Sequence, residues 1–397
     1  MLPNKQLVKN ITDLFKYASH FKKIFLIADK DDGMYDREMA FANFLEMCGL
    51  HVKCVEVNKV KYTGGGYMRY KNLLFGSGEL YIVSRTRLKP FCDYLVRNNI
   101  IDVHKSAVTI ENTYFKINGK CFYVIEEGIY GQLGWKFSSK KATDTSFAFH
   151  IIDHCNLNCQ MCNKFSPLAK EHFIPQKAIL DDAKRLCELT DGTVGKIIIT
   201  GGEPLLHPYL EEILTGIHAI FPNVSIQLQT NGLLLPQKGT AFYELCKNNK
   251  IIIWITKYPI NFDYGAVEND IKKCGCKFVY SMQDIKTSWK FPVDLQGKQP
   301  RFLSLFCWMH GECVNVIEGK ITPCGFMHAS RCFEEKFNIS FDRMEDDYLD
   351  MYKISSWNEI DTFLRKIQPF CRYCDINNWE ENIPWKTSNR EMNEWLA

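Results

Sequence analysis

The stretch His154-Cys-Asn-Leu-Asn-Cys-Gln-Met-Cys162 places three cysteines in a C-x3-C-x2-C pattern, directly after the apolar run Phe147–Ile152. Three thiolates on one short loop can hold three corners of a [4Fe–4S] cube, whereas most such cubes take four cysteines. The next cysteine, Cys187, lies in an amphipathic helical pattern. A cube with three protein ligands leaves one iron open to a small molecule, as a catalytic zinc site keeps one position open. The loop therefore predicts a catalytic metal centre on Cys155, Cys159 and Cys162.

A structural zinc loop, or three thiols without a metal, would be the simpler interpretations of this loop. Structural zinc sites usually take four ligands arranged as two pairs. The x3-x2 spacing with one open corner fits that arrangement poorly. The spacing therefore favours an iron–sulfur cluster.

The composition is that of an ordinary globular chain with many thiols. Its 397 residues are enough for two or three domains, 46% of them are hydrophobic, and the formal net charge is +3. So small a charge does not favour binding to nucleic acid or to a membrane surface. We see no signal-peptide pattern and no run near the ~20 apolar residues of a membrane span. The 17 cysteines are therefore expected to be thiols of a reducing, cytoplasmic compartment, with a metal-binding subset.

Residues 1–140 alternate strand and helix patterns, which predicts a small α/β domain. A dinucleotide-binding domain would carry a glycine-rich turn after its first strand, but Asp29, Asp31 and Asp32 precede Gly33 there. Carboxylates at that turn would repel a pyrophosphate. We expect a degenerate Rossmann-like domain that binds no NAD, NADP or FAD and instead docks substrate or another part of the chain. Its expected strands are Lys23–Ala28, Val52–Val57 and Leu80–Ser84, and its expected helices are Arg37–Cys48 and Leu88–Arg97.

Residues 146–282 show a clearer alternation, which predicts a partial (β/α) barrel. The strand runs are continuously apolar, as is typical of a parallel sheet covered by helices. Right-handed crossovers would curl such a sheet into an open barrel, with the chemistry at the carboxyl ends of its strands. The expected strands are Phe147–Ile152, Lys196–Thr200, Val224–Gln229, Ile251–Ile255 and Phe278–Ser281, and the helical patterns cover Ile179–Cys187, Leu210–Phe221, Tyr243–Cys246 and Val267–Lys273.

Polar or glycine-rich turns follow the later strands. Gly201-Gly202-Glu203-Pro204 follows the strand Lys196–Thr200. Its glycines would let backbone carbonyls approach a cationic amino group closely, and its glutamate could order the turn. Thr230 and Asn231 end the next strand, and Lys257 follows the one after it. Lys257 could pair with a carboxylate or lie in solvent as a surface lysine.

These features resemble the radical S-adenosylmethionine (radical SAM) superfamily over roughly residues 146–282. The resemblance implies that the three loop cysteines bind a [4Fe–4S] cluster and that the methionine part of SAM chelates its open iron. It also implies that one electron, from a donor such as flavodoxin or ferredoxin, cleaves SAM to a 5′-deoxyadenosyl radical that takes hydrogen from a substrate. Met161 stands where the family usually has an aromatic residue near the adenine. The implied SAM-binding residues are Met161, Gly201, Gly202, Glu203, Pro204, Thr230, Asn231 and Lys257.

Residues 283–397 form a cysteine-rich extension that resembles the SPASM and twitch auxiliary-cluster regions of the same superfamily. The segment Cys313–Cys324 looks like a β-hairpin with a cysteine on each arm, and Cys371-Arg-Tyr-Cys374 adds a C-x2-C pair. Two such pairs could bind a second [4Fe–4S] cluster or a zinc ion that staples a lid. Because fewer cysteines stand here than in the full SPASM pattern, we expect one auxiliary cluster. Its expected ligands are Cys313, Cys324, Cys371 and Cys374, with Cys307 as a fifth ligand or an alternative to Cys313.

Together the motifs favour a radical SAM enzyme that acts on a small polar substrate, for which we expect a sugar or a nucleotide sugar. A ribosomal-peptide maturase is the alternative enzyme, but residues 1–140 lack the pattern of a peptide-docking winged helix. A non-catalytic iron–sulfur or zinc protein is the alternative outside enzymes, and the Gly-Gly-Glu-Pro turn at the expected strand end speaks against it. The sequence does not define the substrate, the reaction outcome or the oligomeric state.

Overall fold

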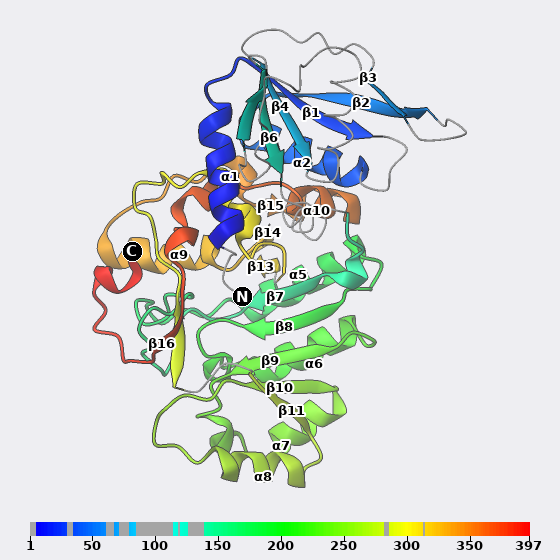
Figure 1. Ribbon diagram of the computed structural model, residues 1–397. Coiled ribbons are helices and arrows are strands. Elements are labelled where there is room, and N and C mark those ends of the chain that lie inside the picture. The colour runs from blue at the N-terminus through cyan, green and yellow to red at the C-terminus, as the bar shows by residue number, and fades with distance from the viewer. Residues whose placement is uncertain are drawn as a thin grey trace. The chain divides into compact units, whose positions relative to one another are not determined.

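The computed structural model describes residues 5–29, 35–60, 67–70, 79–84, 114–117, 120–125, 139–281, 286–312 and 314–397 (Figure 1). The chain divides into two compact units. The first holds Pro3–Ser138 and, unexpectedly, Pro300–Phe306 from much later in the sequence. The second holds Ser139–Gln299 and Cys307–Ala397. Among the described helices, none combines the length and the apolar character that a bilayer crossing requires.

The first unit contains a sheet with the strand order β3-β2-β1-β4-β6-β5. Its central strands β2, β1, β4 and β6 run parallel, whereas the edge strands β3 and β5 are antiparallel to their neighbours. The expected α/β layer is therefore confirmed, but the antiparallel edges were not foreseen. The expected helix Leu88–Arg97 and the turn residues Asp31, Asp32 and Gly33 lie outside the described residues. The elements are α1 (Lys5–Ala18), β1 (Lys23–Asp29), α2 (Tyr35–Met47), β2 (Val52–Val60), β3 (Tyr67–Tyr70), β4 (Glu79–Ser84), β5 (Tyr114–Ile117) and β6 (Lys120–Ile125).

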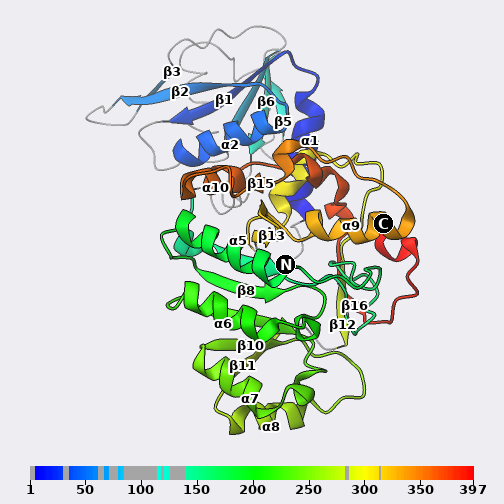
Figure 2. The same ribbon diagram turned by 180° about the vertical axis from the view of Figure 1, so that it is seen from behind.

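The second unit is built on an open sheet with the order β11-β10-β9-β8-β7-β13-β14-β15. All five strands expected within residues 146–282 are present and pair in parallel, in sequence order from one edge. The helices between them match the expected apolar faces, and Figure 2 shows α5 and α6 in front of the sheet. The elements are β7 (Ser146–His150), α5 (Gln176–Leu189), β8 (Lys196–Thr200), α6 (Leu210–Ile220), β9 (Ile226–Thr230), α7 (Leu235–Asn248), β10 (Ile251–Ile255), α8 (Tyr264–Lys273) and β11 (Lys277–Tyr280).

The strands of this sheet are not buried on both faces, although their apolar sequences predicted that they would be. In β9, Ile226 and Leu228 are buried in the hydrophobic core, while Gln227 and Gln229 are only half-buried. β10 shows the same alternation. One face of the sheet therefore packs on helices, and the other carries polar groups where a cofactor can lie.

The expected hairpin near Cys324 is confirmed, and it extends the main sheet. β13 (Val314–Ile317) and β14 (Lys320–Thr322) pair antiparallel around Glu318 and Gly319, whose φ angles are +46° and +77°. Two left-handed residues in a two-residue loop make the type I′ turn that suits the twist of a hairpin. β13 also pairs in parallel with β7, which places Val314 opposite Phe147. The remaining member of the hairpin motif, Cys313, lies outside the described residues.

The rest of the second unit consists of short elements. β12 and β16 form a separate antiparallel pair. An aromatic core that includes Phe165, Phe333, Phe370 and Trp395 joins α9, η6 and η8 to the loop after β7. The elements are β12 (Thr287–Lys290), α9 (Phe326–Phe337), β15 (Leu349–Asp350), α10 (Trp357–Leu364), β16 (Glu380–Pro384) and the 3-10 turns η2 (Ala142–Asp144), η3 (Pro204–Leu206), η5 (Glu345–Asp347), η6 (Pro369–Tyr373), η7 (Ile376–Asn378) and η8 (Met392–Trp395), while η4 (Arg301–Phe306) belongs to the first unit.

Candidate cofactor site

A pocket of about 310 Å³ opens at the carboxyl ends of the parallel strands. Its walls come from the loop after β7, the ends of β8 and β9, the turn after β10, and β12. In a parallel α/β sheet this edge is where ligands bind. The sequence-predicted residues that it brings together are Cys155, Cys159, Met161, Cys162, Gly201, Gly202, Glu203, Thr230 and Asn231.

The two glycines of the turn after β8 are required by the close approach of two loops. The amide of Gly202 donates a hydrogen bond to the carbonyl of Ile152 at 2.7 Å. A Cβ atom on Gly202 would lie 2.0 Å from the carbonyl oxygen of His154. Gly201 has a φ of +152°, and its Cβ would lie 2.3 Å from the oxygen of Ile152. The turn is thus docked on the backbone that leads into Cys155, a structural role that complements the ligand contact expected from its sequence.

Glu203 joins this turn to the end of β9. Its buried carboxylate accepts hydrogen bonds from the amide of Leu205 at 3.0 Å, the hydroxyl of Thr230 at 2.7 Å and the amide of Asn231 at 2.9 Å. Burial raises the pKa of Glu203 to about 7, although the three donors lower it in part. The pocket therefore holds a carboxyl group that can change its charge near neutral pH.

Asn231 reaches from the end of β9 to the cysteine loop. Its side-chain nitrogen lies 2.7 Å from Oδ1 of Asn156 and 3.7 Å from Sγ of Cys155. Its side-chain oxygen accepts a hydrogen bond from the amide of Leu233 at 3.0 Å, which fixes the orientation of the amide group. The loop after β7 is therefore held from β9 as well as from β8.

The thiols of the cysteine loop are poorly solvated. Burial, together with the neighbouring Cys162, raises the pKa of the Cys159 thiol to about 12. Burial and the charge of Glu203 raise the pKa of the Cys155 thiol further. The indole N–H of Trp385 and the hydroxyl of Tyr258 lie close enough to the Cys159 sulfur to offset part of this rise in pKa. Such thiols stay protonated at neutral pH unless a metal takes the place of the proton.

Two of the predicted SAM-binding residues do not line the pocket. Pro204 is buried at the start of η3. The ammonium group of Lys257 lies 3.7 Å from the ring centroid of Tyr280, so it makes a cation–π contact rather than a carboxylate pair within the described structure. Its neighbours Thr256 and Tyr258 line the pocket instead. In an extended segment, side chains alternate between two sides, so every second side chain points away from the pocket. The position of Lys257 after its strand did not indicate on which side its own side chain lies.

Several residues that line the pocket were not predicted from the sequence. Trp289 and Phe291 line the pocket from β12 and the residue after it, with ring centroids 6.0 Å apart. Lys164, two residues after the third cysteine, lines it as well. The aromatic alternation of Trp289 and Phe291 was the available signal, but β12 pairs with the distant β16, which local patterns do not reveal.

The structure also gathers cysteines from the C-terminal extension. Cys324 and Cys374 are both half-buried, and the neighbouring Cys307 raises the pKa of each. Burial raises the pKa of Cys324 to about 11 and that of Cys374 well above its usual value, with Cys371 also contributing to the latter. Of the four predicted ligands, Cys324, Cys371 and Cys374 are thus close together, and Cys307 lies with them.

Zinc ions and iron–sulfur clusters require different spacings of the cysteine sulfurs. A tetrahedral zinc with bonds of ~2.3 Å holds its sulfurs roughly 4 Å apart. Within the described residues, only His150, Asp153 and His328 place three possible ligand atoms within 4.8 Å of one another. No three cysteine sulfurs among the described residues are therefore that close.

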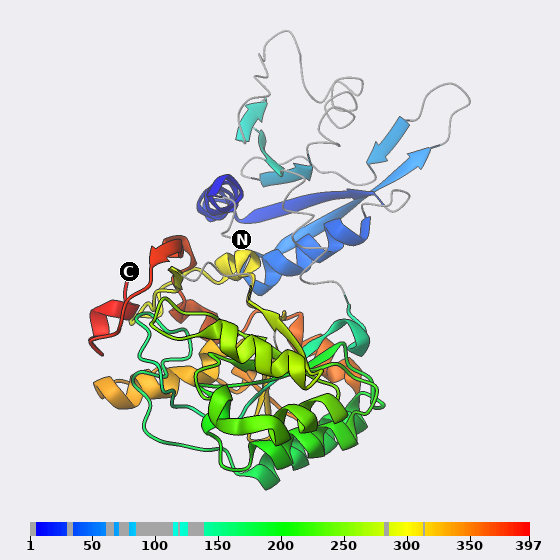
Figure 3. The ribbon, with the colours of Figure 1, turned by 90° about the horizontal axis from the view of Figure 1, so that it is seen from below.

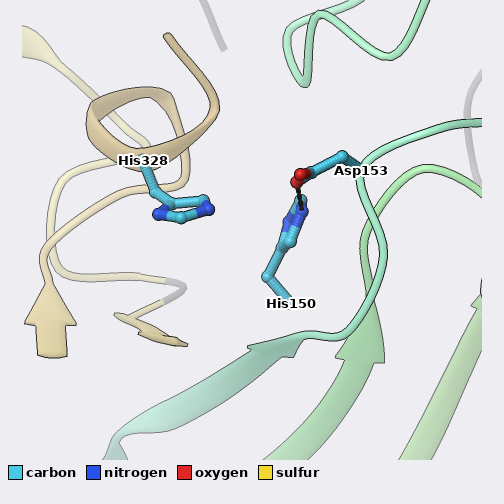
Figure 4. A group of neighbouring side chains, drawn as sticks. All are labelled: His150, Asp153 and His328. Carbon is cyan, nitrogen blue, oxygen red and sulfur yellow. Dashed lines mark hydrogen bonds and ion pairs between the residues drawn. The ribbon is translucent and has the colours of Figure 1, made fainter. Parts of the chain in front are cut away.

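The group His150, Asp153 and His328 lies between the end of β7 and α9 (Figure 4). Nε2 of His150 lies 2.7 Å from Oδ1 of Asp153, and the other oxygen of Asp153 is 2.7 Å from Nδ1 of His172 and 2.6 Å from Arg331. Burial alone would raise the pKa of Asp153, but His150 and Arg331 lower it below its usual value. Because a guanidinium already occupies this carboxylate, we interpret the group as a hydrogen-bonded hub rather than a cation site.

Comparison with known proteins agrees with this geometry. Residues 149–264 match the family model described as the Radical SAM superfamily. The GTP 3′,8-cyclase of Helicobacter pylori (strain HPAG1) is 39% identical over 88 residues, which are 21% of this chain and 26% of that protein. The GTP 3′,8-cyclase of Sulfurovum sp. (strain NBC37-1) is 34% identical over 90 residues, 22% of this chain and 27% of that protein. The chain thus spans about a quarter of the length of the curated relatives it matches.

Solved structures are less similar. The crystal structure of BtrN in complex with AdoMet and 2-DOIA has a TM-score of 0.39 and 15% identity, and it covers 59% of this chain and 94% of BtrN. Native anSMEcpe with bound AdoMet has a TM-score of 0.29 and 19% identity, covering 34% of this chain and 42% of anSMEcpe. The family match over the strands that bear the cysteine loop and the glycine turn decides the assignment. Residues 149–264, which include the cysteine loop and the glycine turn, therefore match the radical SAM superfamily, whose cofactors are a [4Fe–4S] cluster and S-adenosylmethionine.

Proposed function

We propose that Cys155, Cys159 and Cys162 hold the [4Fe–4S] cluster and that the pocket beside them binds SAM. The observation that carries this proposal is the convergence of the cysteine loop, the glycine turn and the polar end of β9 on one pocket. The donor set fits the group, since three half-buried thiols stand on one loop. When bound, the cluster supplies the electron that cleaves SAM to the radical that takes hydrogen from the substrate.

The residues of the chain around the pocket have positioning roles in this proposal. The turn at Gly201 and Gly202 packs on the cysteine loop and leaves room for a ligand's amino group at its free side. Glu203 holds that turn against β9 through its three hydrogen bonds. Trp289 and Phe291 close the wall that faces the sheet. An apolar wall of this kind excludes water, which a reactive radical requires.

We propose a second cluster on Cys324, Cys371 and Cys374, with Cys307 or Cys313 as the fourth ligand. Two effects on pKa support it: Cys307 raises the pKa of Cys324, and Cys307, Cys324 and Cys371 raise that of Cys374, so these side chains lie near one another. Cys324, Cys371 and Cys374 pack against the same aromatic core as Phe165, which belongs to the loop after β7.

We propose a small polar substrate, with a sugar or a nucleotide sugar as the class. The lining of the pocket supports this, since it combines the amide groups of Gln160, Asn163 and Gln229 with the rings of Trp289 and Phe291. Amides hydrogen-bond hydroxyl groups, and aromatic rings pack against the apolar face of a sugar. The name of the relatives, GTP 3′,8-cyclase, indicates a nucleotide substrate in those proteins, which is compatible with this class.

The test of the first cluster is 5′-deoxyadenosine formation from SAM by anaerobically reconstituted, reduced protein. We expect the native chain to form it and the triple variant C155A/C159A/C162A to form none while keeping its circular-dichroism spectrum, because the three residues lie on a loop. Cys187→Ala, which removes a half-buried thiol in α5, is the matched control and should retain the activity. Product formation by the triple variant would contradict the proposal.

The second cluster is tested in the same triple variant by its iron content. We expect about four irons per chain to remain, and further replacement of Cys371 and Cys374 by Ala to remove them. Cys332→Ala, which truncates a buried thiol in α9, should leave the iron content unchanged. A triple variant without bound iron would contradict the second cluster and leave the first one standing.

A further inference from the structure

The segment 385–395 pairs with the cysteine loop, although more than half of the chain separates them in sequence. Cys159 and Thr387 form an antiparallel β-bridge. On one side of it the amide of Gln160 donates to the carbonyl of Lys386 at 2.9 Å, and on the other the amide of Ser388 donates to the carbonyl of Asn158 at 2.7 Å. We call residues 385–395 the clamp segment. Figures 1, 2 and 3 all show the red C-terminal end of the chain on the side of the loop that follows β7.

Side chains reinforce this backbone pairing at both ends of the cysteine loop. Nδ2 of Asn158 donates to the carbonyl of Ser388 at 2.8 Å, so the two residues exchange two hydrogen bonds. At the other end, Nε1 of Trp395 donates to the carbonyl of Cys162 at 3.0 Å. Trp395 is itself buried in the aromatic core, where its ring lies 6.0 Å from that of Phe165. The clamp segment therefore fixes the loop both before and after Cys159.

Trp385 begins the clamp segment next to the sulfur of Cys159. Its amide donates to the carbonyl of Lys286 at 2.9 Å, which ties it to the residue before β12. Its ring lies 6.0 Å from that of Tyr258, which lines the pocket together with Cys159. Its indole Nε1 is buried near the Cys159 sulfur, but within the described residues it makes no hydrogen bond of standard geometry. A buried N–H without a partner is costly, so an acceptor is expected to complete this position.

We propose that the clamp segment is part of the cluster-binding site, and that Trp385 donates its indole N–H to the sulfur of Cys159 when the cluster is bound. The inference rests on the proposed function of the cysteine loop. A thiolate bound to iron is a stronger acceptor than the protonated thiol, since it carries negative charge. Hydrogen bonds to cluster sulfurs stabilise the reduced, more negative state and raise the reduction potential. Trp385 is therefore a positioning and tuning residue for the cluster.

The first test replaces the N–H donor and keeps an aromatic ring. In anaerobically reconstituted Trp385→Phe we expect unchanged iron content and a reduction potential of the SAM-binding cluster below that of the native chain. The potential is measured by a redox titration followed by electron paramagnetic resonance, and the SAM-binding cluster is recognised because its spectrum changes when SAM is added. The matched control is Trp357→Phe, which also loses an indole hydrogen bond, to the carbonyl of Lys140 at 2.9 Å, in α10 away from the pocket.

The second test removes the side-chain part of the clamp. Asn158→Ala loses the bond to Ser388, and we expect its iron to be released several-fold faster to a chelator than in the native chain. Asn389→Ala, in the clamp segment but with only its backbone amide bonded, to Glu394 at 2.7 Å, should release iron at the native rate. Equal potentials in native and Trp385→Phe protein, or equal release rates in the two Asn variants, would overturn the inference. A native chain that takes up no cluster at all would instead refute the proposed function.

Discussion

The two cysteine groups of this protein are assembled in opposite ways. Cys155, Cys159 and Cys162 stand on one loop, so their spacing in the sequence is also their spacing in space. Cys307, Cys324 and Cys374 come from three separate segments, and only the fold brings them near one another. The chemistry of a local motif can therefore be predicted from the sequence. The chemistry of a group of residues from distant segments becomes apparent only when the fold is known.

The two groups nevertheless share one core and one hub. Phe165, on the first cysteine loop, contacts Phe326 and Phe333 of α9 with ring centroids 5.7 and 5.3 Å away. Asp153, just before the first cysteine, is bonded to Arg331 of the same helix. Substitutions at the hub should therefore affect both groups, while substitutions at the glycine turn should affect only the first.

The largest effect is expected at the hub. Asp153→Asn would leave Arg331 and the two histidines without their shared carboxylate, of whose side chain only 5% is exposed. Removing one member of a buried charge pair costs about 3–5 kcal/mol of the free energy of unfolding. Chemical denaturation of the metal-loaded chain would measure this loss, and we expect both proposed clusters to be released faster.

The control for the hub is Glu318→Gln, because Glu318 pairs with Arg331 at 3.6 Å from a half-exposed position. Such a pair contributes at most about 1 kcal/mol. If the two variants were equally stable, Asp153 would not link the two groups.

A smaller and more selective effect is expected at the glycine turn. In Gly202→Ala the new Cβ would meet the His154 carbonyl, so turn and loop must separate, at a cost of about 1–3 kcal/mol. We expect SAM binding to weaken while the iron of the second group stays. Gly216→Ala is the control, since its nearest atom, 2.6 Å away, is the movable Cδ2 of Leu180. Equal SAM affinity in the two variants, measured by titration calorimetry, would contradict the docking role of Gly202.

The smallest effect is a pH dependence at Glu203. Because burial raises its pKa to about 7, the folded chain holds this proton more tightly than the unfolded chain, whose glutamate titrates near 4.3. Stability from this group is therefore present below about pH 4.3 and is lost as pH rises to about 7, by at most roughly 3 kcal/mol. Glu203→Gln should lack this decline. Urea unfolding of both metal-free proteins between pH 5 and 8 would test it, and parallel stability curves would contradict it.

The sequence foretold much of the second unit because its information is local. Each strand of residues 146–282 is a compact apolar run, and each helix shows its own period, so the elements were expected within a few residues of where they lie. The sequence predicted those residues of the pocket lining that belong to the loop and turn motifs. Lys257 was predicted to bind SAM, but its side chain contacts the ring of Tyr280. A shift of one residue along an extended segment changes which side chains face the pocket, and the motif did not fix that position.

What the sequence determined by itself is the set of groups whose function depends on neighbours in the chain: the three loop thiols, the glycines of the turn, and the parallel order of β7 to β11. What only the tertiary structure decided is every pairing between distant segments, such as β13 on β7, Trp289 in the pocket wall, and the clamp segment on the cysteine loop. The physical reason is that any two extended segments can form the same backbone hydrogen bonds, and any two aromatic rings can pack together. Neither sequence therefore indicates which distant segment it will contact.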